Sequence, residues 1–197
     1  LNLKGCRIGP GGAVTLSGSL QTLPHLRVVN LEGNGLDLRA AKSLFTSLHH
    51  CSGLETVDLN TNFLGSEGVG EFAANFEKAG SLTSINLSHN VVGDEGLEAV
   101  SRHAHHLQHL QYLELSDNPM TNDGFGRAFF KNLPEMLELK ELDLSGPYGG
   151  KLAVTDNCVD HLSQALSRVP SLEVLHLRRV AMTSDGFDTF MEAAENH

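Results

Sequence analysis

The sequence predicts one α/β solenoid in which a parallel β-sheet forms the concave face and α-helices form the convex face. Three observations lead to this prediction. A pair of leucines recurs about every 28 residues, an asparagine follows in phase, and apolar residues then recur at helical spacing. One such unit cannot bury its own apolar face, whereas stacked units share a continuous core. At 197 residues, the chain has the length of about one domain.

The leucine period places the strands. Successive gaps between the second leucines of the Leu-x-Leu-like pairs are 28, 28, 28, 28, 29 and 33 residues. A further leucine lies five residues before all but the first of them. Since alternate residues of a strand point to one face, we expect these leucines to face the core. The marker leucines are Leu3, Leu31, Leu59, Leu87, Leu115, Leu144 and Leu177.

An asparagine follows the marker leucine by three residues in four units, at Asn34, Asn62, Asn90 and Asn118. A buried asparagine both donates to and accepts from the backbones of neighbouring turns, so stacked copies predict a ladder of hydrogen bonds. Cys6, Pro147 and Val180 stand at this place in the other units. The side chains of Pro147 and Val180 cannot make ladder bonds.

Each turn is followed by a predicted helix. The segments 93–96 and 121–124 supply capping residues and first-turn acids, and apolar residues such as Leu97 and Val100 follow at helical spacing. Strands pack about 4.8 Å apart and helices about 10 Å apart, so the stack must curve with the sheet inside. We interpret the acids at the predicted helix starts as structural residues, not as an acid–base pair: Asp94, Glu95, Asp123 and Asp185.

The pattern Leu-x-x-Leu-x-Leu-x-x-Asn-x-Leu-x-x-x-Gly, repeated at 28 residues, resembles the leucine-rich repeat family in its ribonuclease-inhibitor-like subclass. The resemblance covers residues 1–197, with about six repeats from Leu26 onward and a partial first repeat. It implies a horseshoe fold and a protein-binding role. Because the chain begins within a predicted strand and shows no polar capping repeat, we expect it to be a segment of a longer protein.

Composition excludes several classes of function. With 24 acidic and 14 basic residues, the net charge of −10 argues against binding to nucleic acid. No apolar run approaches the roughly 18 residues that a membrane span needs. Cys6, Cys51 and Cys158 form no Cys-x-x-Cys pair, so we expect reduced, buried thiols and a cytoplasmic location.

The strand phase predicts which residues face a partner on the concave side. Its middle is acidic through residues such as Asp58 and Glu114, and its C-terminal end is basic through Arg178 and Arg179. Such a face either recruits a basic partner protein or is an ordinary solvated sheet face. Tyrosine and arginine are frequent in binding hot spots, so Tyr112 and Arg178 are the expected anchors. The candidate partner-binding residues are Asp58, Asn86, Tyr112, Glu114, Asp143, Tyr148, His176 and Arg178.

The fifth unit is longer, and its extra residues fall in a glycine-rich loop over residues 146–151 at the rim of the concave face. Long loops on rigid scaffolds often carry function, and they also tolerate neutral insertions. A functional contact through Tyr148 and a neutral insertion both remain open. The loop lacks the Gly-Lys-Ser/Thr of a phosphate-binding loop.

The sequence gives no case for an enzyme. His103, His105, His106 and His109 form the densest histidine cluster, in which a helix would place His105 and His109 on one face, at a spacing that can hold zinc. No third ligand is evident, so we predict neither a metal nor a cofactor. No Gly-x-Ser-x-Gly or His-Glu-x-x-His motif occurs, and we predict a non-enzymatic protein.

The resemblance implies a protein-interaction scaffold, similar to cytoplasmic inhibitors, NOD-like immune sensors and tropomodulin-like actin regulators. The alternative is a regulator of a small GTPase, as in the Ran GTPase-activating proteins. Its candidate trans-acting arginines would be Arg7, Arg39 and Arg102. A third possibility is a self-assembling structural element, because uncapped solenoid ends expose apolar surface.

Overall fold

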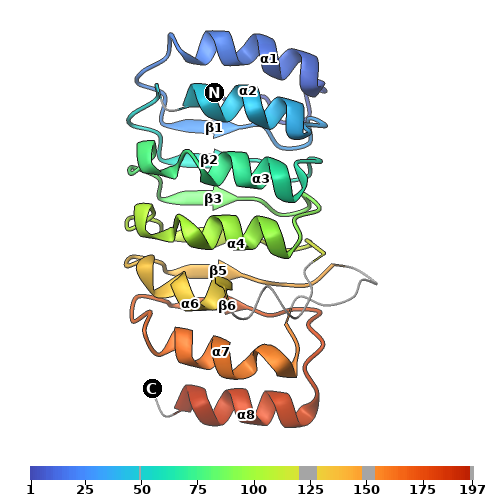
Figure 1. Ribbon diagram of the computed structural model, residues 1–197, viewed down its shortest axis with the longest axis vertical. Helices are drawn as coiled ribbons and strands as arrows, with labels where there is room; N and C mark the ends of the chain where they lie inside the picture. The colour runs from blue at the N-terminus through green and yellow to red at the C-terminus, as the bar shows by residue number, and fades with distance from the viewer. Residues whose placement is uncertain (49, 120–127, 148–153, 196–197) are drawn as a thin grey trace.

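The computed structural model describes residues 1–48, 50–119, 128–147 and 154–195, and it confirms the predicted solenoid (Figure 1). Six parallel strands of three residues each form one sheet in the order β1-β2-β3-β4-β5-β6. Neighbouring strands pair in register, so that Val29, Val57 and Ile85 lie side by side. The strands are β1 (Val28–Asn30), β2 (Thr56–Asp58), β3 (Ser84–Asn86), β4 (Tyr112–Glu114), β5 (Glu141–Asp143) and β6 (Val174–His176).

Helices alternate with the strands and form a second layer. They are α1 (Gly9–Leu20), α2 (Leu38–Leu48), α3 (Gly65–Ala73), α4 (Asp94–Arg102), α6 (Phe130–Asn132), α7 (Asp156–Leu166) and α8 (Ser184–Glu195). Short 3₁₀ turns follow three of them, at η1 (Phe76–Lys78), η2 (Ala104–His106) and η4 (Leu133–Glu135). In Figure 1 the helices spread further along the long axis than the strands do. The sheet is therefore the concave layer, as the different packing distances of strands and helices require.

The core lies between the two layers. Leu59, Leu87 and Leu115 are completely buried, as the leucine period predicts. Phe45 of α2, Phe72 of α3 and Phe76 of η1 extend this core. The ring centroids of Phe45 and Phe72 are 4.6 Å apart, and those of Phe72 and Phe76 are 5.0 Å apart. Full burial of each such side chain contributes about 1.5–3 kcal/mol to folding.

The predicted asparagine ladder is present. The Asn90 amide donates to the carbonyls of Leu59, Leu87 and Ser88 at 2.8, 3.2 and 3.0 Å. The Asn118 side-chain oxygen accepts from the backbone N–H of Asn90 at 2.9 Å. The same pattern holds at Asn34 and Asn62, and all four asparagines are at most 2% exposed. The ladder therefore supplies hydrogen bonds to turns that water cannot reach.

The expected burial of all three cysteines is wrong at one position. Cys51 and Cys158 are buried, whereas Cys6 is exposed. Cys6 lies in the turn four residues after Asn2, and Asn2 forms only an isolated bridge to Asn30. Cys6 is therefore at the open edge of the sheet. In the last repeat, Leu175 and Leu177 are only partly buried because β6 is the opposite edge strand.

Two sequence features fall partly or wholly outside the described residues. They are the helix start at 121–124 and most of the glycine-rich loop at 146–151, including Tyr148. The acids Asp94, Glu95 and Asp185 lie in the first turns of α4 and α8, as predicted. None of the described helices is both long and apolar enough to cross a membrane.

Candidate functional site

The residues between the core leucines face outward on the concave side, as the strand phase predicts. Val28, Tyr112 and Val174 are 47%, 45% and 40% exposed, while the central residue of each of their strands is buried or partly buried. Two residues further along each strand, the in-register row runs through Asn30, Asp58, Asn86, Glu114, Asp143 and His176. The structure therefore brings five of the eight candidate binding residues into a single row.

Local hydrogen bonds hold several of these side chains in place. The Asp58 carboxylate accepts the backbone N–H of Asn60 at 3.0 Å and the side-chain amide of Asn30 at 2.8 Å. Asn86 accepts the backbone N–H of Ser88 at 3.0 Å. These contacts turn the chain at the end of each strand and fix the direction of the side chain. The row is therefore ordered before any partner arrives.

Asp143 departs from the expectation that the whole row is exposed. It is 7% exposed, and its carboxylate accepts the backbone N–H of Ser145 at 2.8 Å. Its in-register neighbours are Glu114 and His176, whose longer side chains flank it. Asp143 contributes negative charge to the face but offers little surface for contact.

A hollow of about 270 Å³ lies over β2, β3, β4 and the start of β5, and we call it the acidic hollow. Its lining includes three carboxylates, those of Asp58, Glu114 and Glu141, beside the ring of Tyr112. Burial raises the pKa of the Glu114 carboxyl, and the negative charges of Asp143, Asp58 and Glu141 raise it further. Burial likewise raises the pKa of Asp58. The hollow thus concentrates negative charge that a cation would stabilise.

The C-terminal end of the concave face is a chain of three polar side chains. His176 Nε2 lies 3.1 Å from Glu141 Oε1, and His176 Nδ1 lies 3.3 Å from the Arg178 guanidinium. The guanidinium only donates, so Nδ1 accepts and the proton sits on Nε2, facing Glu141. This arrangement links the expected anchor Arg178 to the edge of the acidic hollow.

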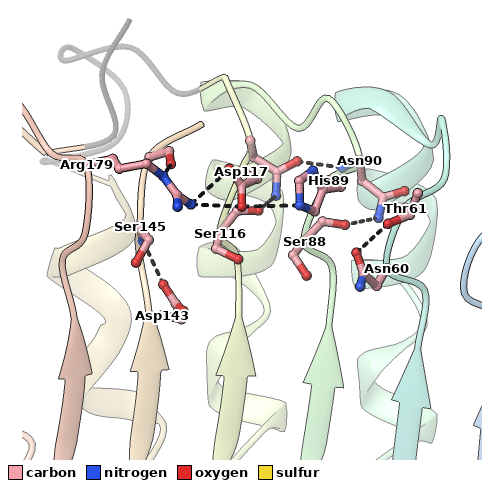
Figure 2. Close-up of polar contacts among 12 residues, drawn as sticks. Asn60, Thr61, Ser88, His89, Asn90, Ser116, Asp117, Asp143, Ser145 and Arg179 are labelled. Atoms are coloured by element: carbon pink, nitrogen blue, oxygen red, sulfur yellow. Dashed lines mark hydrogen bonds and ion pairs between the residues drawn. The ribbon is translucent and has the colours of Figure 1, made fainter. Parts of the chain in front are cut away.

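The expectation that Arg179 also makes this end basic is wrong. Its guanidinium lies 3.0 Å from the Asp117 carboxylate, which is also 3.2 Å from the His89 imidazole (Figure 2). Thr61, His89, Asp117 and Arg179 all follow a marker leucine by two residues, with φ values of 55°, 52°, 56° and 55°. This shared backbone conformation lines up their side chains along the rim. Sequence reasoning missed this cluster, although its signal was charged residues recurring at one turn position.

The histidine cluster lacks the predicted helical geometry. His105 and His106 lie in η2 and His109 lies beyond it, so His105 and His109 do not share a helix face. His109 instead lies 2.9 Å from Glu138. In the described part of the chain, no group of three or more histidine, cysteine, aspartate or glutamate residues is placed to hold a metal ion.

The three arginines considered for a GTPase regulator lie apart. Arg7 is on the turn before α1, Arg39 is on α2, and Arg102 ends α4 with its guanidinium 2.8 Å from Glu98. Arg39 and Arg102 thus belong to the convex layer. The structure brings none of them next to the acidic hollow.

Comparisons with known proteins agree with the fold. The family model described as Leucine Rich repeat matches residues 1–17, 81–101 and 106–125. Comparison with curated protein sequences gives no match. The solved structure of "Leiomodin-1 Actin-Binding Site 2 (ABS2)" is similar over 91% of this chain and 85% of that chain, with a TM-score of 0.56 and 11% identity. Family match, leucine period and asparagine ladder together identify this chain as a leucine-rich repeat protein with repeats of the ribonuclease-inhibitor type.

Proposed function

We propose that the concave face binds a partner protein by taking up one of its lysine or arginine side chains in the acidic hollow. Leucine-rich repeat domains in general are protein-interaction scaffolds. The single observation that carries the finer proposal is the group of three carboxylates, Asp58, Glu114 and Glu141, around one hollow. Their mutual repulsion is relieved when a cation enters.

The hollow suits a long basic side chain better than a small ion. Tyr112 is 45% exposed and lines the hollow beside the carboxylates. Its ring supports the aliphatic part of a lysine or arginine and attracts the charged end through a cation–π contact. Beside the hollow, Arg178 and Glu141 are joined through His176. Arg178 would then contact an acidic group of the partner protein and Glu141 a basic one, on either side of the inserted residue.

The partner itself is defined here only by this chemistry. Actin binding, which gives the similar leiomodin structure its name, belongs to that protein. At 11% identity, the likeness extends to the fold alone. The proposal for this chain is a protein ligand with an exposed basic residue, whatever its family.

A photocrosslinking experiment tests the proposal. A photoreactive phenylalanine replaces Tyr112 in the full chain, and the same group replaces Thr46 on the convex helix α2 as the control position. We expect crosslinked partners from cells at position 112 only. These crosslinks should fall at least tenfold when Asp58→Asn and Glu114→Gln are combined, and they should weaken as salt rises.

Two outcomes would contradict the proposal. The same partners could crosslink from position 46, which would mean that the concave face is not the contact surface. Crosslinking at position 112 that withstands the double substitution would mean that the carboxylates do not recruit the partner. If the crosslinked partner is a small GTPase, a single-turnover hydrolysis assay then decides whether the chain also accelerates that reaction.

A further inference from the structure

The convex side carries a second hollow with the opposite chemistry. It lies between α6 and α7, which are neighbours in Figure 1, and has a volume of about 430 Å³. The residues that line it are Phe130 and Lys131 of α6, His161, Gln164 and Ala165 of α7, and Arg168 just beyond α7. The last four recur at helical spacing, so they form one stripe facing α6. We call this hollow the basic groove.

The charges of the groove run against those of the whole chain. Lys131 and Arg168 are both exposed, and neither forms an ion pair with another residue that the structure describes. None of the described residues lining the groove is acidic. In a protein of net charge −10, these two cations beside one hollow form a local positive field. Such a field attracts an anion.

His161 is the third polar group of the basic groove, and it supports a bound ligand by an argument that does not depend on charge. The Nδ1 atom of His161 is buried and has no hydrogen-bond partner among the described residues. Buried polar atoms in folded proteins almost always have a partner, so this atom leaves a hydrogen bond for a bound group or a water molecule to make. The imidazole of His161 lines the groove and is partly exposed, so it is a third polar group beside Lys131 and Arg168.

We propose that the basic groove binds a phosphorylated serine or threonine side chain of a partner protein. A phosphate carries close to two negative charges and three acceptor oxygens, which match an ammonium, a guanidinium and an imidazole N–H. A nucleotide fits less well, because Phe130 is only 1% exposed and cannot offer a ring face for stacking.

An NMR titration of the whole chain tests this proposal. The probe is the blocked amino acid N-acetyl-phosphoserine amide, with N-acetylserine amide and N-acetylglutamate amide as controls. We expect saturable amide shifts confined to α6, α7 and the turn that holds Arg168 with the phosphorylated probe, and at least tenfold weaker binding after Lys131→Gln or Arg168→Gln. The matched control Arg39→Gln, on α2, should bind as the unchanged chain does.

The spectra also keep the result interpretable, because dispersed peaks in each variant show that it has folded. Equal binding of the glutamate probe would overturn the assignment to phosphate. Shifts spread over the whole chain, no shifts at all, or shifts that survive both substitutions would overturn the site.

Discussion

The guanidinium of Arg179 lies 3.0 Å from the carboxylate of Asp117, although the two residues are 62 positions apart in the sequence. The same side chain donates through Nε to the carbonyl of Gly146 at 2.7 Å. Arg179 therefore ties together the turns that follow β4, β5 and β6 (Figure 2). It does so next to Pro147, whose side chain cannot continue the asparagine ladder.

We predict that Arg179→Ala destabilises the C-terminal repeats by about 1–2 kcal/mol, since it removes charge-assisted hydrogen bonds from a partly exposed side chain. Hydrogen exchange should quicken at the backbone amides of Asp117 and Gly146, each of which donates to a carbonyl in the turn of the next repeat. Arg178→Ala is the matched control, because the Arg178 guanidinium contacts His176 and does not bridge the turns. Equal acceleration in both variants would contradict the bridging role of Arg179.

The asparagine ladder gives a second prediction. Asn90→Ala removes one of the two donors to each of the carbonyls of Leu59, Leu87 and Ser88 in a buried turn. At about 0.5–1.5 kcal/mol for each of the three lost hydrogen bonds, we expect a loss of about 2–4 kcal/mol in the free energy of unfolding. Urea denaturation measures this loss.

Asn60→Ala is the control for this substitution. Asn60 lies two residues before the ladder position, and its side chain accepts only the hydroxyl of Thr61 among the contacts described. The change should cost within about 0.5 kcal/mol. A loss at Asn90 no larger than the loss at Asn60 would show that water or relaxed backbone replaces the ladder bonds.

The fold could be predicted from sequence because its period is encoded twice, once in the leucines and once in the asparagines. Each repeat meets only its neighbours, so local patterning decides both the strands and the core. Leu59, Leu87 and Leu115 are buried in one line, and Asn62, Asn90 and Asn118 form one ladder, as the spacing predicts.

The sequence predicted which side chains of the candidate site point to the concave side, but not how exposed each of them is. Asp58 and Asp143 occupy the same repeat position, yet Asp58 is only partly buried while Asp143 is 7% exposed, with the long side chains of Glu114 and His176 on either side of it. Such an effect depends on residues from adjacent repeats, not on the period. The reach of Arg179 across a whole repeat to Asp117 likewise follows from side-chain length and not from spacing.

Backbone strain on the rim supports a third prediction. Val91 has a φ of 57°, a conformation that costs a β-branched residue free energy, while Gly35 occupies the same repeat position with a φ of 66°. Val91 is also 57% exposed, so its side chain contributes little packing. We expect Val91→Gly to raise the free energy of unfolding by about 1 kcal/mol.

Phe63 provides the comparison, because it stands at the same repeat position without a positive φ. There, glycine only adds freedom to the unfolded chain, so Phe63→Gly should lower stability by about 0.5–1 kcal/mol. Thermal unfolding of both variants measures the difference. The same sign of change in both would rule out strain at Val91 as the cause.

The acidic hollow makes stability depend on pH through Glu114. Burial, followed by the charges of Asp143, Asp58 and Glu141, raises the pKa of this carboxyl above the ordinary value of 4.5. The folded chain then holds the proton more tightly than the unfolded chain does. This group therefore lowers the free energy of unfolding as pH rises from 4.5 through the raised pKa, and the loss is complete above it.

Glu114→Gln removes this loss, so the variant should be more stable than the unchanged chain at pH 7, and the gain should shrink steadily below the raised pKa. Urea denaturation at a series of pH values measures both curves. Glu77→Gln, at an exposed position in η1, should shift stability within about 0.5 kcal/mol at every pH. A Glu114→Gln variant that is less stable than the unchanged chain at pH 7 would contradict this prediction. It would mean that the Glu114 carboxylate makes a favourable contact within the folded chain. The acidic hollow would then lack the unbalanced negative charge that attracts a basic side chain.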